Sequence, residues 1–264
     1  MGRNRHIIRR MDLGPLAAGD DRSLCDRVVR TLGSAIVREE VAPGAWFSTE
    51  AALGARFGVS RSVIREALKR LEGKGLIEAR PKRGVMVLSR DRWHLLDPEV
   101  ASWRYKGVRE PRLLLELVGF REVIEPALAA AAALQAKAED AAELRALAVA
   151  MREAGSNSAE LIRADHALHR AVARIAGNSL LYSAFAALEP GMAELRSVGS
   201  ESRLRGPGHN EDHLLLVEAI VDGRPEVARE TMARIVHASR LQVMEFFDRS
   251  PSAPARTSLR EGTD

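Results

Sequence analysis

The sequence predicts a mostly α-helical protein with one small β-hairpin near its N-terminus. Apolar residues make up 46% of the 264 residues, enough for a real core, whereas aromatic residues make up only 4%. That balance argues against an aromatic-rich β-sandwich and is typical of helical proteins rich in Ala, Leu, Arg and Glu. Apolar side chains recur at helical spacing through most of the chain, and glycine and proline interrupt the pattern where helices would end.

The N-terminal third predicts three helices followed by a hairpin. Ser23, Ser48 and Ser60 are each placed to start a helix, and Gly58 to turn the chain between the second helix and the third. The segment Arg80-Pro-Lys-Arg-Gly gives the hairpin a cationic tip. The expected helices run over 24–40, 49–57 and 61–73, and the expected strands over 76–79 and 85–88.

Beyond residue 97 the pattern is helical throughout. Asp97-Pro98 is a helix start, with an N-cap residue and proline at the first helical position. Gly177 and Gly223 are expected to end helices, and Pro126 to kink one. The expected helices run over 98–105, 111–137, 140–154, 158–176, 179–197, 210–222 and 225–248.

Charge is divided unevenly along the chain. Residues 1–90 have a net charge of +8 and residues 91–264 of −4, which suggests a polyanion-binding module attached to another domain. No apolar run is long enough to span a bilayer, so we expect no membrane partner. The single cysteine, Cys25, excludes an intramolecular disulfide and a cysteine-based zinc finger, and it fits a reducing compartment. We therefore expect a cytoplasmic protein.

Two short helices separated by a glycine turn and followed by a hairpin describe a winged helix-turn-helix. The third helix offers two arginines from its first two turns, where a recognition helix reaches base edges in the major groove, and arginine pairs with guanine there. Serines at the helix start suit phosphate contacts, and the hairpin tip would reach the flanking phosphates or minor groove. The alternative is a solvated basic face. The candidate residues for binding double-stranded DNA are Ser60, Arg61, Ser62, Arg65, Lys82 and Arg83.

The stretch FGVSRSVIREALKRLEGKGLI, which starts at Phe57 and is closed by Lys82-Arg83-Gly84, resembles the winged-helix domain of GntR-family transcription regulators. In that family the arginines that match Arg61 and Arg65 contact DNA, so the resemblance implies the same role here. The chain departs from the family at Ala51, where many members have arginine after the matching glutamate. The operator sequence therefore should not be borrowed from relatives.

Four polar residues of the C-terminal part form a candidate metal site. Asp165 and His169 are i, i+4 neighbours on or beside the apolar stripe of one predicted helix, where an ionised carboxylate needs a partner or a cation. His213 and His237 lie near apolar residues of two further predicted helices. An Asp/His₃ set suits Zn, Ni, Mn or Fe, and we expect zinc first. For each histidine alone, the alternative is a hydrogen-bonded core residue.

Five segments resemble, in order, the all-helical FCD ligand-binding domain of the FadR subfamily of GntR regulators. In that family the matching Asp and three His bind a divalent metal beside a carboxylate effector, and the resemblance implies the same four ligands here. The segment from Trp93 to Trp103 resembles the linker of regulators of D-galactonate and other sugar-acid catabolism. The five segments are Arg121-Glu-Val-Ile-Glu-Pro-Ala-Leu, Asp165-His-Ala-Leu-His, Gly177-Asn178, Asp212-His-Leu-Leu-Leu-Val-Glu-Ala-Ile and Met232 with His237.

Two further residues are candidates for effector binding. A metal with an open coordination position would accept the carboxylate of a sugar acid. Arg121 is a candidate second clamp on that carboxylate, and its alternative is a surface position or a structural ion pair. Asn178 is a candidate for the hydroxyl groups, and its alternative is a helix cap.

We therefore expect a homodimeric, ligand-responsive regulator that represses a sugar-acid operon and leaves its operator when the effector binds. Two alternatives stay open. One is a metal-dependent enzyme acting on a small carboxylate, although the chain has no His-Glu-x-x-His signature. The other is a dimeric DNA binder without a ligand response. The expected organisation is a flexible basic arm (1–22), a winged helix-turn-helix (23–90), a linker with a short helix (91–109), a metal- and effector-binding domain (110–248) and a disordered tail (249–264).

Overall fold

The computed structural model describes residues 23–46, 49–80, 83–154, 158–201 and 208–249. The expected basic arm, the tail from residue 250 onward and Lys82 lie outside these residues. The chain divides into two compact units, and each is described by itself. The first comprises residues 1–108 and 182–194, and the second residues 109–181 and 195–264.

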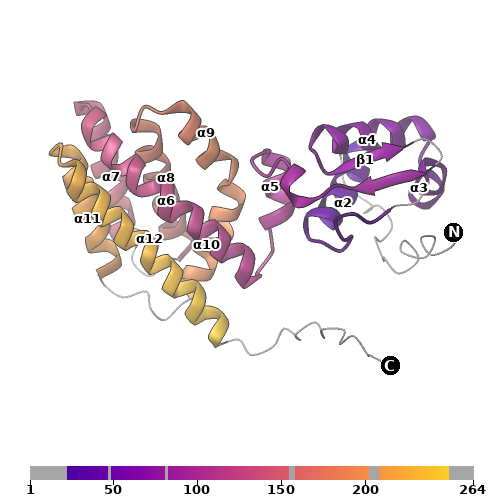
Figure 1. Ribbon diagram of the computed structural model, residues 1–264. Helices are drawn as coiled ribbons and strands as arrows, with labels where there is room; N and C mark the ends of the chain where they lie inside the picture. The colour runs from indigo at the N-terminus through magenta and orange to yellow at the C-terminus, as the bar shows by residue number, and fades with distance from the viewer. Residues whose placement is uncertain (1–22, 47–48, 81–82, 155–157, 202–207, 250–264) are drawn as a thin grey trace, which may run out of the picture. The chain divides into compact units, whose positions relative to one another are not determined.

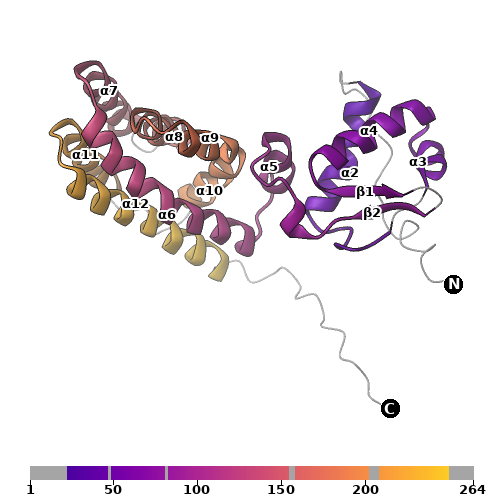
Figure 2. The same cartoon turned by 45° about the horizontal axis from the view of Figure 1, so that its top comes forward.

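The first unit contains the winged helix-turn-helix (Figure 2). Its two strands pair antiparallel, with Ile77 opposite Val87 and Arg80 opposite Gly84. Side-chain oxygens cap the helices as expected from their sequence, except that Thr49 rather than Ser48 caps the second one. The elements are α2 (Leu24–Val37), α3 (Glu50–Phe57), α4 (Arg61–Gly73), β1 (Ile77–Arg80) and β2 (Gly84–Val87).

The turn between α3 and α4 depends on Gly58. Its φ angle is +64°, in the left-handed region that residues with a side chain rarely adopt. The turn lets Leu53 of α3 and Ile64 of α4 join the core that α2 and the two strands complete, where both are fully buried. Burying these faces leaves the opposite side of α4 exposed, and that side carries Arg61 and Arg65.

The short helix α5 (Pro98–Tyr105) packs against α2 within the first unit. Gly33 of α2 permits this contact, because a Cβ atom there would lie 2.4 Å from the Trp103 ring. The Arg38 side chain donates a hydrogen bond from Nε to the Trp103 carbonyl at 3.1 Å. The segment that follows the wing is therefore attached to the helix-turn-helix.

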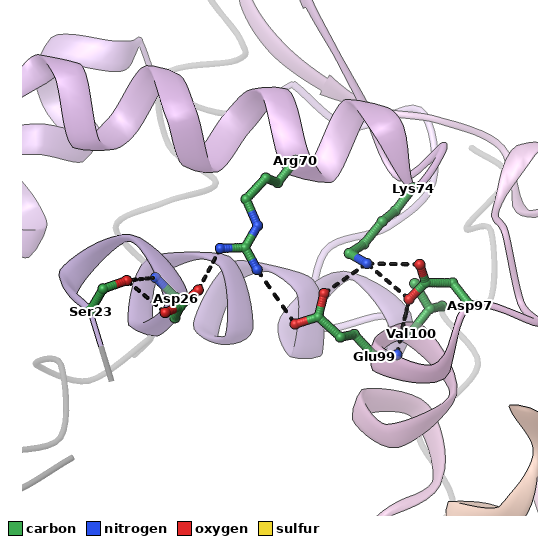
Figure 3. A network of polar contacts seen from close by, with 7 residues as sticks. All are labelled: Ser23, Asp26, Arg70, Lys74, Asp97, Glu99 and Val100. Carbon is green, nitrogen blue, oxygen red and sulfur yellow. Dashed lines mark hydrogen bonds and ion pairs between the residues drawn. The ribbon is translucent and has the colours of Figure 1, made fainter. Parts of the chain in front are cut away.

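Charged side chains also connect the C-terminal end of α4 to α5 (Figure 3). Lys74 Nζ lies 2.8 Å from Asp97 Oδ2 and 2.8 Å from Glu99 Oε2, and Asp97 in turn accepts backbone hydrogen bonds as the N-cap of α5. Arg70 bridges from Asp26 of α2 to Glu99. Burial alone would raise the pKa of Asp97, but the hydrogen bond from Lys74 holds it below its usual value.

We expect Lys74→Met to lower the stability of the first unit by about 1–2 kcal/mol at neutral pH, because Asp97 loses a charged partner. Since the folded-state pKa of Asp97 is depressed, its stabilising contribution is present above about pH 4 and is lost as the pH falls through the folded value. Urea denaturation should therefore separate variant and wild type at pH 7 and bring them together in acid. Lys69→Met, at an exposed position of the same helix, is the control; equal midpoints for both variants would contradict the prediction.

The described residues beyond α5 form only α-helices, most of which belong to the second unit. The long helices α6 and α12 run side by side over much of their length (Figure 1), and α8 and α11 pack against α6. Beyond α5 the chain forms α6 (Pro111–Gln135), α7 (Ala138–Ala154), α8 (Ser158–Ile175), α9 (Ser179–Ala187), α10 (Glu189–Glu201), α11 (Gly208–Val221) and α12 (Pro225–Asp248). The predicted class, mostly helical with one small hairpin, is confirmed.

One predicted helix is divided in two in the structure. The helix expected over 179–197 is two helices, α9 and α10, separated at Leu188. Pro190 favours the break, because proline has no backbone N–H and is best tolerated in the first turn of a helix, where it lies in α10. Pro126 lies inside a continuous α6. Among the described residues, no helix is both long and apolar enough to cross a membrane.

Candidate nucleic-acid interface and candidate metal centre

The start of α4 presents its polar side chains to solvent. Ser60 Oγ accepts a hydrogen bond from the Val63 backbone N–H at 3.4 Å and lies 2.8 Å from Ser62 Oγ. Arg61, Ser62 and Arg65 are exposed. This is the arrangement that a recognition helix needs, because its first turns must reach base edges and phosphates.

A hollow runs between the starts of α3 and α4 and the wing. Three arginines line it, Arg61, Arg65 and Arg80, and Ala51 lies among them. Arg80 was not predicted as a contact, although it opens the cationic run at the hairpin tip. Its Nε atom lies 2.9 Å from Glu78 Oε1. The full lining is Thr49, Glu50, Ala51, Arg61, Arg65, Ala79, Arg80, Gly84 and Val85.

The wing is the second part of the interface. Arg83 is exposed, and its guanidinium carbon lies 4.9 Å from the centre of the Trp46 ring, so a cation–π contact orients it. The predicted contact Lys82 lies outside the described residues. Recognition helix and wing together offer a cationic surface of the kind that binds a DNA backbone.

The candidate metal centre lies in the core of the second unit. Asp165 and His169 of α8 meet His213 of α11, and one ligand atom from each lies within 4.8 Å of the others. His213 Nε2 is 3.2 Å and His169 Nε2 is 3.7 Å from Asp165 Oδ1. All three residues are buried. The structure therefore brings together three of the four predicted ligands.

His237 does not join this cluster, and the expectation of a fourth ligand is corrected. α12 turns Met232, Ile235 and Val236 inward, and each residue along a helix rotates by 100°. His237 follows the last of these and is exposed. Ile235 instead lines the cavity beside the cluster.

Glu125 of α6 completes the buried site, although it was not among the residues predicted for it. His169 Nδ1 lies 2.7 Å from Glu125 Oε2, whereas no described residue forms a hydrogen bond with His169 Nε2. A carboxylate on one ring nitrogen fixes the tautomer that leaves the other nitrogen as a ligand. Burial alone would raise the pKa of Glu125, but Arg121 and His169 hold it well below its usual value. Its i, i+4 spacing from Arg121 is the sequence feature that could have predicted this ion pair.

Both residues predicted to contact the effector, Arg121 and Asn178, form hydrogen bonds within the chain. Arg121 is buried and forms a two-armed ion pair with Glu125, with Nε 2.6 Å from Oε1 and Nη2 3.2 Å from Oε2. Asn178 is exposed, and its Oδ1 accepts backbone hydrogen bonds at 3.1 Å from both Leu180 and Leu181, which caps the start of α9. Arg121 therefore lines the buried cavity as one member of an ion pair, and Asn178 lies outside that lining.

A cavity of about 20 Å³, room for one water molecule, adjoins the cluster. Arg196 of α10 enters it and donates a hydrogen bond from Nε to Asp165 Oδ2. Burial alone would raise the pKa of Asp165, but Arg196 and the nearby imidazoles hold it well below its usual value. The lining is Arg121, Ile162, Asp165, His169, Leu195, Arg196, Gly199, Ile235, Ser239 and Gln242.

The donor set fits a divalent metal. Two imidazole nitrogens and a carboxylate oxygen are the ligands of many catalytic and regulatory sites, and they leave a coordination position for a further ligand. The His169 nitrogen that no described residue bonds points to such an ion, because buried polar atoms normally have a partner.

An exposed arginine-bearing helix and wing, with a buried polar site in a second unit, define a ligand-responsive DNA-binding transcription regulator. Residues 24–87 match the family described as "Bacterial regulatory proteins, gntR family", and residues 116–238 match the FCD domain. The chain belongs to the GntR family and carries an FCD domain. Because this is a family of transcription regulators, the metal-dependent enzyme is set aside.

Curated relatives agree with this assignment, and a similar solved structure has the same fold. The chain is 30% identical over 224 residues to the galactonate operon transcriptional repressor of Escherichia coli, which covers 84% of this chain and 97% of that protein. It is 25% identical over 240 residues to the Uxu operon regulator of Haemophilus influenzae, covering 86% and 85%. A solved structure titled for Lar, which controls the expression of the agr system of Listeria monocytogenes, has the same fold, with a TM-score of 0.52, 20% identity and coverage of 86% and 99%.

Proposed function

We propose that this chain is a cytoplasmic homodimeric repressor of an operon for the catabolism of a sugar acid or a related carboxylate, and that its effector releases it from the operator. The exposed start of α4, with Arg61 and Arg65 beside the wing, carries the DNA-binding part of the proposal. A dimer would place two such helices on the two halves of a palindrome. Relatives named for galactonate and Uxu operons support the sugar acid.

The proposal includes a divalent metal, zinc first, held by Asp165, His169 and His213. When bound, the metal would supply a Lewis-acid position for the effector carboxylate. Glu125 keeps the imidazole of His169 in the ligand tautomer. Ser239 and Gln242, which line the cavity, offer hydrogen-bonding groups for hydroxyls. An effector changes DNA affinity only by the difference between its affinities for the DNA-bound and the released conformations.

A thermal-shift screen of aldonic and aldaric acids, with and without EDTA, tests the ligand class and the metal together. Binding to the folded state stabilises it by RT ln(1 + [L]/Kd), so the melting temperature rises with the logarithm of the ligand concentration once this exceeds Kd. The acid that gives the largest shift should also release the full-length protein from its operator in gel shifts. No shift with any acid, or a shift without release of DNA, would contradict the proposal.

His213→Ala should abolish metal uptake and the thermal shift by the effector while leaving operator affinity unchanged, because His213 belongs to the buried cluster of the second unit. The metal content is measured after zinc loading, and the operator affinity is measured by gel shift. His237→Ala is the matched control, since the structure leaves this exposed histidine outside the cluster. Loss of metal from His237→Ala instead would restore the four-ligand prediction.

A further inference from the structure

Arg196 already occupies one side of the candidate metal centre. Its Nε atom bonds to Asp165 Oδ2, and its side chain is only 6% exposed. The two Nη atoms are buried and, among the described residues, have no hydrogen-bond partner. They belong to a guanidinium that lines the cavity together with Ser239 and Gln242. A buried guanidinium with two unused donors marks a site for an acceptor, because such groups are normally paired.

The charges of the site balance without a metal. Arg121 neutralises Glu125, and Arg196 neutralises Asp165, while the imidazoles of His169 and His213 add no charge when neutral. A divalent ion would therefore bring two uncompensated positive charges into a buried site, which is costly. It would also lie a few ångströms from the guanidinium that shares its carboxylate ligand, and like charges repel strongly at that range.

We propose that Arg196 is the resident cation of this site and competes with the divalent metal for Asp165. This inference rests on the proposed metal site. Metal binding then requires the guanidinium to leave the carboxylate, and an anion that pairs with its Nη atoms stabilises the displaced position. Carboxylate and metal consequently strengthen each other's binding by the same factor.

The alternative arrangement, in which Arg196 serves only packing, makes a different prediction. A packing residue can be replaced by methionine of similar length without changing the affinity of the neighbouring ligands for zinc. Replacing a competing cation by methionine does change the affinity for zinc, since its removal exposes the full charge of Asp165 to the metal. The affinity for zinc therefore separates the two roles.

The test is a zinc titration of the full-length, EDTA-treated and dialysed protein by calorimetry. Arg196→Met should bind zinc at least 10-fold more tightly than wild type, whereas Arg196→Lys, which keeps the charge, should stay within about 3-fold of it. Arg163→Met, at an exposed position of α8, is the control for loss of a positive charge near the ligands. Because Arg196→Met leaves Asp165 unpaired, its melting temperature should be low without zinc and recover with it.

A second measurement repeats the zinc titrations of wild type and Arg196→Met in the presence of acetate. Sodium acetate at tens of millimolar should tighten zinc binding by wild type more than by Arg196→Met, in which acetate can still bind the metal but has no guanidinium to pair with. Equal zinc affinity of wild type and Arg196→Met, or an equal effect of acetate on both, would overturn the competition and leave the metal site standing. Absence of zinc binding by every variant would overturn the metal site itself, and with it this inference.

Discussion

Replacement of Arg65 by alanine is expected to weaken specific operator binding about 10- to 100-fold, which corresponds to about 1–3 kcal/mol. The arginine is exposed near the start of α4 and lines the hollow between this helix and the wing. A guanidinium in that position would form two parallel hydrogen bonds with a guanine edge. Its loss should therefore reduce sequence preference as well as affinity.

Fluorescence anisotropy with an operator duplex and a scrambled duplex of equal length measures both effects. Lys69→Ala is the matched control, because Lys69 is exposed on the same helix but one turn farther from its start. That variant should bind both duplexes more weakly, to a similar extent, and its binding should depend less on salt concentration, as expected from the loss of a phosphate contact. If Arg65→Ala binds the operator with unchanged preference, α4 is not the recognition helix.

The winged unit was predictable because its signals are local. Serine caps, a glycine turn and apolar spacing all act within one or two turns of the chain, and Ser60, Gly58 and α4 appear where these signals place them. The strands are shifted by a single residue, with Ile77–Arg80 in place of 76–79. End effects of this size depend on hydrogen bonds between strands that a linear pattern does not specify.

The buried polar site was only partly predictable because it depends on helix phase and on contacts between distant segments. Asp165 and His169 share one helix face by their spacing, so their pairing follows from the sequence. His237 was assigned to the wrong side of α12, where a shift of one residue turns a side chain by 100°. No local pattern links Arg196 to Asp165, which lies 31 residues away and meets it only through packing.

Breaking the buried pair of Arg121 and Glu125 is expected to have the largest effect on stability. Both side chains are almost fully buried, with exposed fractions of 3% and 2%. Arg121→Met leaves the Glu125 carboxylate without its main partner and should cost about 3–5 kcal/mol, the range found when one member of a buried pair is removed. Since the folded-state pKa of Glu125 is depressed, this cost is present above about pH 4.3 and shrinks as the carboxylate is protonated in acid.

The double variant Arg121→Met/Glu125→Leu distinguishes loss of charge balance from loss of packing. Removing both charges should recover most of the stability, since apolar residues of similar volume replace a buried ion pair at little cost. Recovery should be incomplete, because His169 Nδ1 loses its partner. The pair of Arg240 and Glu122 connects α12 to α6 with both side chains 30% exposed, and its single variants should each cost less than about 1 kcal/mol in the same urea titrations. A double variant no more stable than Arg121→Met would show that the two side chains stabilise the unit by shape rather than by charge.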